Sequence, residues 1–130
     1  KRLESVTIYP SIALWGSCVF QSCTSLIEVN LKDGLEKIGK QAFANCLSLS
    51  SIVIPHSVTE IGGYAFADCA LKKVYCKPTT PPRIIKNSRV FGFVDSNSEL
   101  EINVPTASLD EYKNHPDWSE YSLILKDGYF

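Results

Sequence analysis

A near-duplicate segment of about a dozen residues is the feature that most constrains this chain. Residues 35–46 read LEKIGKQAFANC and residues 58–69 read VTEIGGYAFADC, which is a shift of 23 positions. The same shift aligns a series of apolar or glycine columns over three successive units. The columns are Leu3, Leu26 and Leu49; Val6, Val29 and Ile52; Ile8, Leu31 and Ile54; Ile12, Leu35 and Val58; Trp15, Ile38 and Ile61; Gly16, Gly39 and Gly62; Phe20, Phe43 and Phe66; and Cys23, Cys46 and Cys69. A fixed period of this kind indicates a repeat architecture, in which each unit packs against the next.

Each unit changes its hydrophobic period part of the way along. The pattern L-x-x-V-x-L ends in strict alternation, so Val29 and Leu31 lie on one side of a short strand. A glycine such as Gly39 follows, and the segment at 42–46 then places alanine, phenylalanine and cysteine on one face at helical spacing. Stacked copies bury these faces against each other, so we predict an α/β repeat solenoid with short helical turns. The predicted strands span residues 26–31, 49–54, 71–76 and 100–104, all parallel and in one sheet.

The end of the chain departs from the repeat. The fourth unit begins one residue early with Leu71, residues 77–99 follow no repeat, and the pattern returns as LEINVP at 100–105. We assign residues 1–105 to coils of about 23 residues, with an irregular fourth coil at 71–105, and residues 106–130 to a C-terminal helical cap. Lys1 enters a strand-like repeat directly, without a lid, so we expect further coils upstream.

The predicted cap contains signals for a helix that covers the end of the stack. Pro105 ends the last strand, and Ser108 with Glu111 has the spacing of a capping box. The apolar residues expected over the exposed end are Leu109, Tyr112 and Trp118. An alternative role for the two aromatic residues is a platform that binds carbohydrate.

Composition points to no catalytic, metal or nucleic-acid site. The formal net charge is -1, with 21% charged residues, so the chain has no overall attraction to nucleic acid or to an anionic membrane. No run approaches the ~18 apolar residues of a membrane span, and no phosphate-binding glycine loop is present. His56 and His115 lie in turn-like settings without a metal or triad pattern, and we expect surface residues. We therefore predict no catalytic residue, no cofactor and no metal.

The cysteines number five, so at least one thiol lacks an intramolecular partner. Members of the column Cys23, Cys46 and Cys69 would lie about 4.8 Å apart on stacked coils and point the same way, whereas a disulfide needs Cβ atoms about 3.8 Å apart. We expect these three residues and Cys76 to be reduced core residues. Cys18 aligns with outward-leaning positions and is the best candidate for a reactive thiol. A free-standing hydrolase that uses Cys18 is disfavoured because no base accompanies it.

Outward-facing strand positions form the predicted contact surface. In L-x-x-V-x-L the third and fifth residues, and the residue after the strand, face away from the core. In successive coils these positions are Ser5, Thr7 and Tyr9; Glu28, Asn30 and Lys32; Ser51, Val53 and Pro55; and Lys73, Tyr75 and Lys77. The fourth row combines a large amphipathic ring with two lysines, and a basic loop follows it. The candidate partner-binding residues are therefore Lys73, Tyr75, Lys77, Arg83, Lys86 and Arg89, which we expect to contact a protein or an anionic glycan. The alternative is that Lys73 faces Glu101 in an ordinary cross-strand ion pair.

The repeat resembles that of a known family, the BspA-like leucine-rich repeats of bacterial surface proteins. The resemblance rests on LSLSSIVIPHSVTEIGGYAFADCALKKVYC, on two weaker copies before it, and on the tail INVPTASLDEYKNHPDWSEY, which together cover about four fifths of the chain. It departs from the pattern at ALWGSCVF in the first unit and over residues 77–99. The resemblance implies a leucine-rich repeat fold and a non-catalytic binding module, secreted or on the cell surface, that mediates adhesion to a protein or a cell-surface glycan. It implies no nucleic acid and no membrane insertion in this segment. The alternative is an accessory or spacer domain of a larger surface enzyme.

Overall fold

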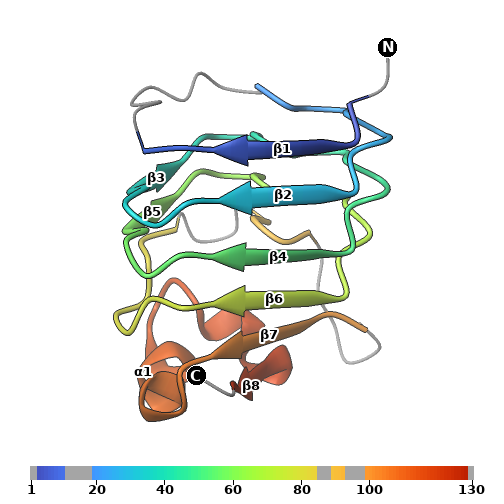
Figure 1. The fold of residues 1–130 in the computed structure, drawn as a ribbon. Coiled ribbons are helices and arrows are strands. Elements are labelled where there is room, and N and C mark those ends of the chain that lie inside the picture. Colours follow the sequence, from blue (N-terminus) through green and yellow to red (C-terminus); the bar gives the residue numbers. More distant parts are fainter. Residues whose placement is uncertain (1–2, 11–18, 85–88, 93–98, 129–130) are drawn as a thin grey trace.

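Parallel strands stacked one above another define the fold. The computed structural model describes residues 3–10, 19–84, 89–92 and 99–128. The strands are β1 (Ser5–Ile8), β2 (Glu28–Leu31), β3 (Lys37–Ile38), β4 (Ser51–Ile54), β5 (Glu60–Ile61), β6 (Lys73–Cys76), β7 (Glu101–Val104) and β8 (Leu125–Asp127). All but β3 and β5 lie on one side of the molecule and run in the same direction (Figure 1). The predicted strands are therefore confirmed in position and direction, although each is shorter than predicted.

The prediction of one continuous sheet is wrong. β1 pairs with β2, and a separate sheet has the order β4-β6-β7-β8, so the ladder is interrupted between β2 and β4. At the end of the first pair the amide of Lys32 donates to the carbonyl of Ile8, and after β4 the amide of Lys77 donates to that of Ile54. Pro55 occupies the equivalent position between β2 and β4 and has no N–H to donate. Pro55 is also buried, so its predicted outward orientation is wrong as well.

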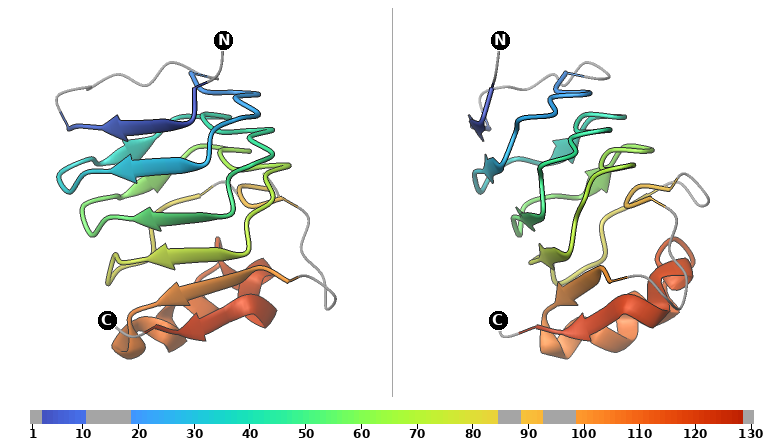
Figure 2. Two further views of the ribbon diagram at one scale, coloured as in Figure 1. Left: turned by 45° about the vertical axis from the view of Figure 1, so that its right-hand side comes forward. Right: turned by 90° about the vertical axis from the view of Figure 1, so that its right-hand side faces the viewer.

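A second sheet lies on another side of the coils and was not predicted. β3 pairs in parallel with β5, and an isolated parallel bridge joins Glu60 to Arg83. The second and third coils leave the side of the long strands, pass through this second sheet and return through a run of turns (Figure 2). Ile38 and Ile61 of β3 and β5 point inward and are buried.

The segment at 42–46 forms consecutive turns rather than the predicted helical turn. The amides of Ala42, Ala44 and Cys46 each donate to the carbonyl three residues earlier, whereas the amides of Gln41, Phe43 and Asn45 donate to the next coil. Gln41 and Asn45 have φ values of 53° and 62°, and these left-handed residues prevent a helix. The predicted inward face is nevertheless confirmed, because the alanine, phenylalanine and cysteine of 42–46 are all buried.

A column of stacked phenylalanine rings fills the core behind these turns. The ring centroids of Phe20 and Phe43 lie 5.4 Å apart, those of Phe43 and Phe66 lie 5.5 Å apart, and those of Phe66 and Phe91 lie 5.8 Å apart. The planes deviate from parallel by only 5° to 7°. Identical residues in successive coils thus pack by simple translation.

Phe91 shows that the fourth coil keeps the repeat, contrary to the prediction for residues 77–99. Ile84 is buried one period after Ile61, and the amide of Phe66 donates to the carbonyl of Val90 as the amide of Phe43 donates to that of Ala65. Ile84 lies 23 positions after Ile61, but Phe91 lies 25 positions after Phe66. Two extra residues therefore put the end of this coil out of register in the sequence while its packing positions remain.

The C-terminal segment, defined as residues 106–127, packs beneath the fourth coil. It contains the helices η1 (Thr106–Ser108), α1 (Leu109–Asn114) and η2 (Ser119–Ile124), followed by β8, which pairs in parallel with β7 (Figure 1). Trp118 and Tyr112 are both 0% exposed, and Leu109 packs against the core at its edge. The prediction that these residues face the coils is confirmed, and the alternative of an exposed carbohydrate platform is wrong.

The predicted capping box is also wrong. Ser108 is the residue before α1, but its side chain makes no capping hydrogen bond. Its hydroxyl instead donates to the carbonyl of Thr79, at 2.8 Å, and so joins the C-terminal segment to the fourth coil. Pro105 follows the last residue of β7, as predicted.

Candidate binding surface

The strand face, defined as the outward-facing residues of β1, β2, β4, β6, β7 and β8, is the candidate binding surface. No described element covers it (Figures 1 and 2). Alternation along each strand buries every second side chain and leaves the others toward solvent, as in β4, where Ser51 and Val53 are exposed and Ile52 and Ile54 are buried. The predicted outward positions are therefore confirmed, apart from Pro55 and from the partial burial of Thr7, Tyr75 and Lys77.

Tyr75 lies at the centre of the row that joins the last strands. Its neighbours are Val53 on β4 and Asn103 on β7. Val53 is 40% exposed and Tyr75 is half-buried, so an apolar surface and an amphipathic ring lie side by side. A stiff aromatic side chain provides contact area at a small cost in conformational entropy.

Lys73 forms an ion pair with Glu101, its partner in the ladder. Its Nζ lies 3.5 Å from Oε1 of Glu101, and both side chains are about half exposed. The alternative prediction, an ordinary cross-strand ion pair between Lys73 and Glu101, is therefore confirmed. An exposed pair of this kind contributes at most about 1 kcal/mol to stability, but it neutralises the charge that Lys73 would offer to a partner.

Two residues of the strand face were missed by the sequence reasoning. β8 places Lys126 opposite Asn103, directly beside the Tyr75 row. The Nδ2 atom of Asn103 is buried and has no hydrogen-bond partner within the described part of the chain. Lys126 is exposed, and neither Lys126 nor Lys77 forms an ion pair with any described residue. The segment LILKD has three apolar residues followed by two charged ones and does not alternate, so no strand signal marked it.

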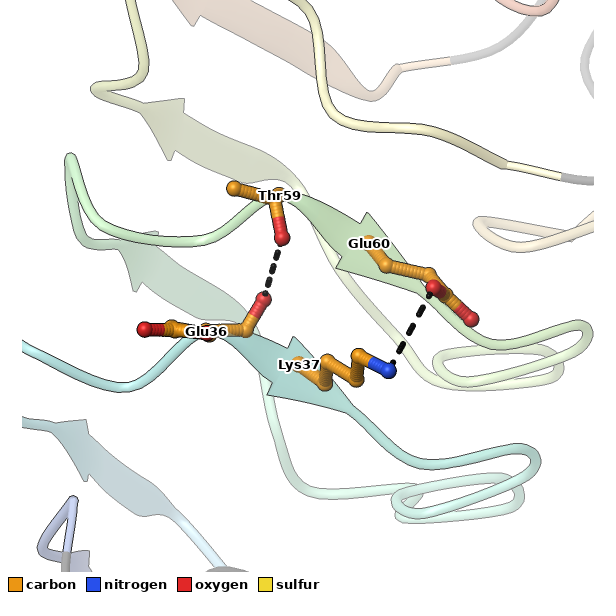
Figure 3. Close-up of polar contacts among 4 residues, drawn as sticks. All are labelled: Glu36, Lys37, Thr59 and Glu60. Atoms are coloured by element: carbon orange, nitrogen blue, oxygen red, sulfur yellow. Dashed lines mark hydrogen bonds and ion pairs between the residues drawn. The ribbon is translucent and has the colours of Figure 1, made fainter.

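The basic loop does not join Lys73 and Tyr75 on the strand face. Arg83 lies beside Glu60 in the second sheet, where Lys37 and Glu60 form an ion pair of 3.9 Å (Figure 3). The hydroxyl of Thr59 also donates to the carbonyl of Glu36 in this sheet. Lys37, Glu60 and Arg83 thus follow one another as a column of alternating charge.

Arg89 lies on a third side of the molecule, and Lys86 lies outside the described residues. Arg89 has a φ value of 50° and occupies the left-handed position of the turns that Gln41 and Tyr64 occupy in earlier coils. Of the candidate partner-binding residues, the structure therefore brings together Lys73, Tyr75 and the adjacent Lys77 only.

The cysteine column is held by hydrogen bonds to the backbone. Sγ of Cys46 donates to the carbonyl of Phe20 at 3.2 Å, and Sγ of Cys69 donates to the carbonyl of Phe43 at 3.0 Å. Cys23, Cys46, Cys69 and Cys76 are all free thiols, which confirms the prediction for these four residues. Cys23 and Cys69 are half-buried rather than fully in the core, and Cys18 lies outside the described residues.

Three of the described thiols have raised pKa values, whereas a hydrogen bond with Cys69 lowers the pKa of Cys46, which is fully buried. Burial raises the pKa of Cys23, and a hydrogen bond with Cys46 together with burial raises the pKa of Cys69. Burial also raises the pKa of Cys76 to about 12, and the sulfur of Cys76 lies 3.5 Å from the hydroxyl of Tyr112. Because the thiolate is the reactive form, a raised pKa makes these three thiols poorer nucleophiles at neutral pH than an ordinary cysteine.

The histidines form no metal site with other described residues. His56 is exposed, as predicted, whereas His115 is half-buried and its Nδ1 accepts a hydrogen bond of 3.1 Å from the amide of Asp117. Among the residues that the structure describes, no group of three or more His, Cys, Asp or Glu side chains is placed to hold a metal ion. None of the described helices is long and apolar enough to cross a membrane.

Comparison with known proteins identifies the repeat. Residues 1–110 match the family model for the BspA type leucine rich repeat region, in six copies. The chain therefore belongs to the BspA-type leucine-rich repeat family. Members of leucine-rich repeat families are generally non-catalytic modules that mediate protein interactions. No curated protein matches the chain.

Proposed function

We propose that this chain is a non-catalytic binding module of a secreted or cell-surface bacterial protein, and that the strand face is its contact surface for a protein or a cell-surface component. The observation that carries the proposal is the uncovered sheet β4-β6-β7-β8, with half-buried Tyr75 beside exposed Val53. Aromatic residues flanked by apolar and polar neighbours are typical of the centres of protein interfaces.

The repeat architecture supports such a role. In this proposal residues 1–105 form a solenoid of coils, with the irregular coil at 71–105, and residues 106–130 form its C-terminal cap. A solenoid offers one extended surface whose outward residues vary without disturbing the core. The cap closes the apolar end of the stack with Tyr112 and Trp118, leaving the sides available for contact.

Positive charge near β6 and β8 of the strand face favours an acidic partner there. Lys77 follows β6 two residues after Tyr75, and Lys126 lies on β8 at the end of the Tyr75 row. Lys73 contributes less than the sequence suggested, because Glu101 pairs with it. Charges at the rim of an interface that are opposite in sign to those of the partner mainly increase the association rate. They also select against partners of the same sign.

The second candidate function is an accessory or spacer domain of a larger surface enzyme. The ion pair of Lys37 with Glu60 and the hydrogen bonds in the second sheet favour a stiff element, since the column of Lys37, Glu60 and Arg83 runs along the stack. Tests on the strand face separate the two, because a spacer does not use it.

A capture experiment tests the proposal. The immobilised chain is incubated with extracts of host or neighbouring cells, and each captured protein is then titrated against purified variants. We expect Tyr75→Ala to weaken binding by at least about tenfold, as truncation of an interface centre does, and Lys77→Glu to slow association with an acidic partner. Neither variant should lower the melting temperature appreciably.

Matched substitutions on other sides of the molecule serve as controls. Tyr64 is an exposed tyrosine of the turns, and Lys40 is an exposed lysine next to Gly39. Tyr64→Ala and Lys40→Glu should leave the affinity unchanged. Equal losses from all four variants would show that the strand face has no special role and would favour the spacer interpretation.

A further inference from the structure

A small cavity opens at one corner of the coils, outside the strand face. It has a volume of about 220 Å³ and lies between the chain that leaves β4 and the chain that leaves β6. The described residues that line it are His56, Val58, Thr59, Pro78, Thr79, Thr80 and Pro81. Val58 and the two prolines are buried, whereas the histidine and the three threonines are exposed around the opening. The cavity therefore has an apolar floor and a polar rim.

The corner one coil earlier is closed by a serine. Ser57 accepts a hydrogen bond from the amide of Gly34 at 2.7 Å and donates to the carbonyl of Leu35 at 2.7 Å. Its hydroxyl thus joins two adjacent coils. Thr80 occupies the same position one period later, but its hydroxyl has no hydrogen-bond partner among the described residues. The link that closes the regular corner is missing here.

Prolines limit the backbone hydrogen bonds that the two coils can form at this corner. The proline corner, defined as Pro78–Pro82, contains three prolines that have no N–H to donate to the preceding coil. Backbone hydrogen bonds between these two coils end at Lys77, which donates to the carbonyl of Ile54, and resume at Arg83, which donates to that of Thr59. The cavity lies in this interval.

The proline corner is held rigidly from the other side. The hydroxyl of Tyr112 donates to the carbonyl of Pro78 at 2.5 Å, and the indole Nε1 of Trp118 donates to that of Pro82 at 2.7 Å. Ser108 donates to the carbonyl of Thr79. The cavity wall is therefore fixed before any ligand arrives, which lowers the entropic cost of binding.

The lining selects for a neutral, hydroxylated molecule. Among the described lining residues none carries a carboxylate, an ammonium or a guanidinium group, so phosphate and other fixed charges find no partner. The threonine hydroxyls both donate and accept hydrogen bonds, as sugar hydroxyls do, and the imidazole of His56 offers a further ring N–H donor. The floor of Val58, Pro78 and Pro81 offers aliphatic surface to a C–H face. The volume is below the ~300 Å³ at which pockets for drug-sized ligands begin, so it suits a single ring.

We propose that this cavity binds one neutral pyranose sugar, with its C–H face on Val58 and the prolines and its hydroxyls on His56, Thr79 and Thr80. The sugar is either a free monosaccharide or one residue of a glycan chain. The site adds a ligand class to the binding module proposed above, but it shares no residue with the strand face. Either site can therefore fail without the other.

Titration of the ¹⁵N-labelled chain with methyl glycosides of glucose, galactose and mannose tests the proposal. At least one glycoside should shift the amide resonances of Val58, Thr79 and Thr80, with a Kd of about 1 mM as expected for so small a ligand. Thr80→Val and His56→Ala should each weaken that binding about fivefold, the effect of losing one hydrogen bond. Thr24→Val, an exposed threonine of another loop, should leave the Kd unchanged.

Three results would overturn the proposal. These are the absence of shifts with all three glycosides, shifts that map away from the proline corner, and an unchanged Kd in both Thr80→Val and His56→Ala. Shifts of the same amides by a proline-containing tripeptide, without an effect of any sugar, would assign the cavity to peptide instead and also overturn it.

The source of the sugar is decided with the glycoside that binds. A soluble polysaccharide of the same sugar is titrated beside it. Binding of the polysaccharide more than about tenfold tighter would show that further chain residues contribute and that a glycan is the ligand. Equal affinity per sugar would identify the free monosaccharide as the ligand. Both outcomes support the pyranose site.

Discussion

The interface between the third and fourth coils and the interface beneath the fourth coil provide acceptors for backbone amides with different atoms. Between coils, the amide of Phe66 donates to the carbonyl of Val90 at 2.8 Å, and the amide of Ile61 donates to the carbonyl of Arg83 at 2.9 Å. Beneath the fourth coil, the equivalent amides of Phe91 and Ile84 find side chains instead. The acceptors are the hydroxyl of Tyr121 at 3.4 Å and the carboxylate of Asp117 at 3.2 Å.

This difference explains where the repeat is required and where it is not. A coil that lies between two similar coils must present a carbonyl at each position where its neighbour has an amide, so the spacing is fixed. The C-terminal segment meets only one coil, and individual side chains supply its hydrogen bonds. Its sequence is therefore free of the period, although its contacts are as specific.

The aromatic contacts follow the same division. Phenylalanines of successive coils stack with planes within 7° of parallel. At the end of the column, Phe91 meets Trp118 at 46° and Tyr121 at 77°. Translation of one unit gives parallel rings, whereas a segment of different structure approaches the last ring by its edge.

Replacement of Trp118 should have the largest effect on stability, because it breaks the second interface, defined as the contact between the fourth coil and the C-terminal segment. Trp118→Ala removes a fully buried indole and leaves the carbonyl of Pro82 without its donor. We expect the free energy of unfolding to fall by about 4 to 6 kcal/mol, from the lost packing and the unsatisfied group together. Denaturant melts followed by far-ultraviolet circular dichroism measure the loss.

Trp118→Phe is the companion variant, because it keeps an aromatic ring but removes the Nε1 donor and part of the indole volume. It should cost about 2 to 3 kcal/mol, less than Trp118→Ala. A loss below about 1 kcal/mol for Trp118→Ala would show that the C-terminal segment contributes little to the stability of the coils, and the comparison of the two interfaces would fail.

The contacts between successive coils were mostly predictable from the sequence, because each contact recurs in every coil. The columns located the long strands, the phenylalanine stack and the free cysteines at 23, 46, 69 and 76. The second sheet was missed because β3 and β5 are only two residues long, too short for alternation to be visible. The predicted helical turn was wrong because the buried residues of the segment 42–46 happen to have the spacing of one helix face. The left-handed backbone of Gln41 and Asn45, which prevents a helix, does not change that spacing.

The candidate sites were predictable only in part, for a related reason. The row around Tyr75 follows from strand alternation, which is local. The ladder that brings Lys126 beside Asn103 depends on how the C-terminal segment folds back. Arg83 lies in the second sheet, whereas Arg89 occupies a left-handed position of the later turns, and no local pattern shows this separation. The cavity at the proline corner depends on the absence of hydrogen bonds, which a pattern of residue types does not display.

Alkaline pH should weaken the second interface through Cys76. This thiol is buried against Tyr112 of the C-terminal segment, and burial raises its pKa from 9.0 to about 12. The folded state therefore holds the proton more tightly than the unfolded state. The stabilisation is fully present below pH 9 and is lost between pH 9 and 12, by up to about 1.4 kcal/mol per pH unit. Cys76→Ala lacks this slope.

Denaturant melts of both proteins at several pH values from 8 to 11 measure the effect. Cys76→Ala should be less stable at pH 8, and the difference in free energy of unfolding from the parent chain should narrow as the pH rises. Parallel curves over the whole range would mean that Cys76 titrates alike in the folded and unfolded states. Water would then reach the space between β6 and the C-terminal segment.

The smallest expected effect distinguishes two corners one period apart. Ser57 links adjacent coils through two hydrogen bonds of 2.7 Å, whereas Thr80 at the equivalent position has no partner among the described residues. Ser57→Ala should lower the free energy of unfolding by about 1 to 2 kcal/mol, since it leaves the amide of Gly34 and the carbonyl of Leu35 without this link. Thr80→Ala should change it by less than about 0.5 kcal/mol, as is usual for an exposed side chain. Thermal melts of the two alanine variants, run side by side, resolve this difference. If both substitutions cost the same, Thr80 closes its corner as Ser57 does, and the prolines leave no opening between the coils. A loss at Ser57 alone instead means that the Thr80 hydroxyl does not link the two coils, which leaves this hydroxyl available to a ligand in the cavity.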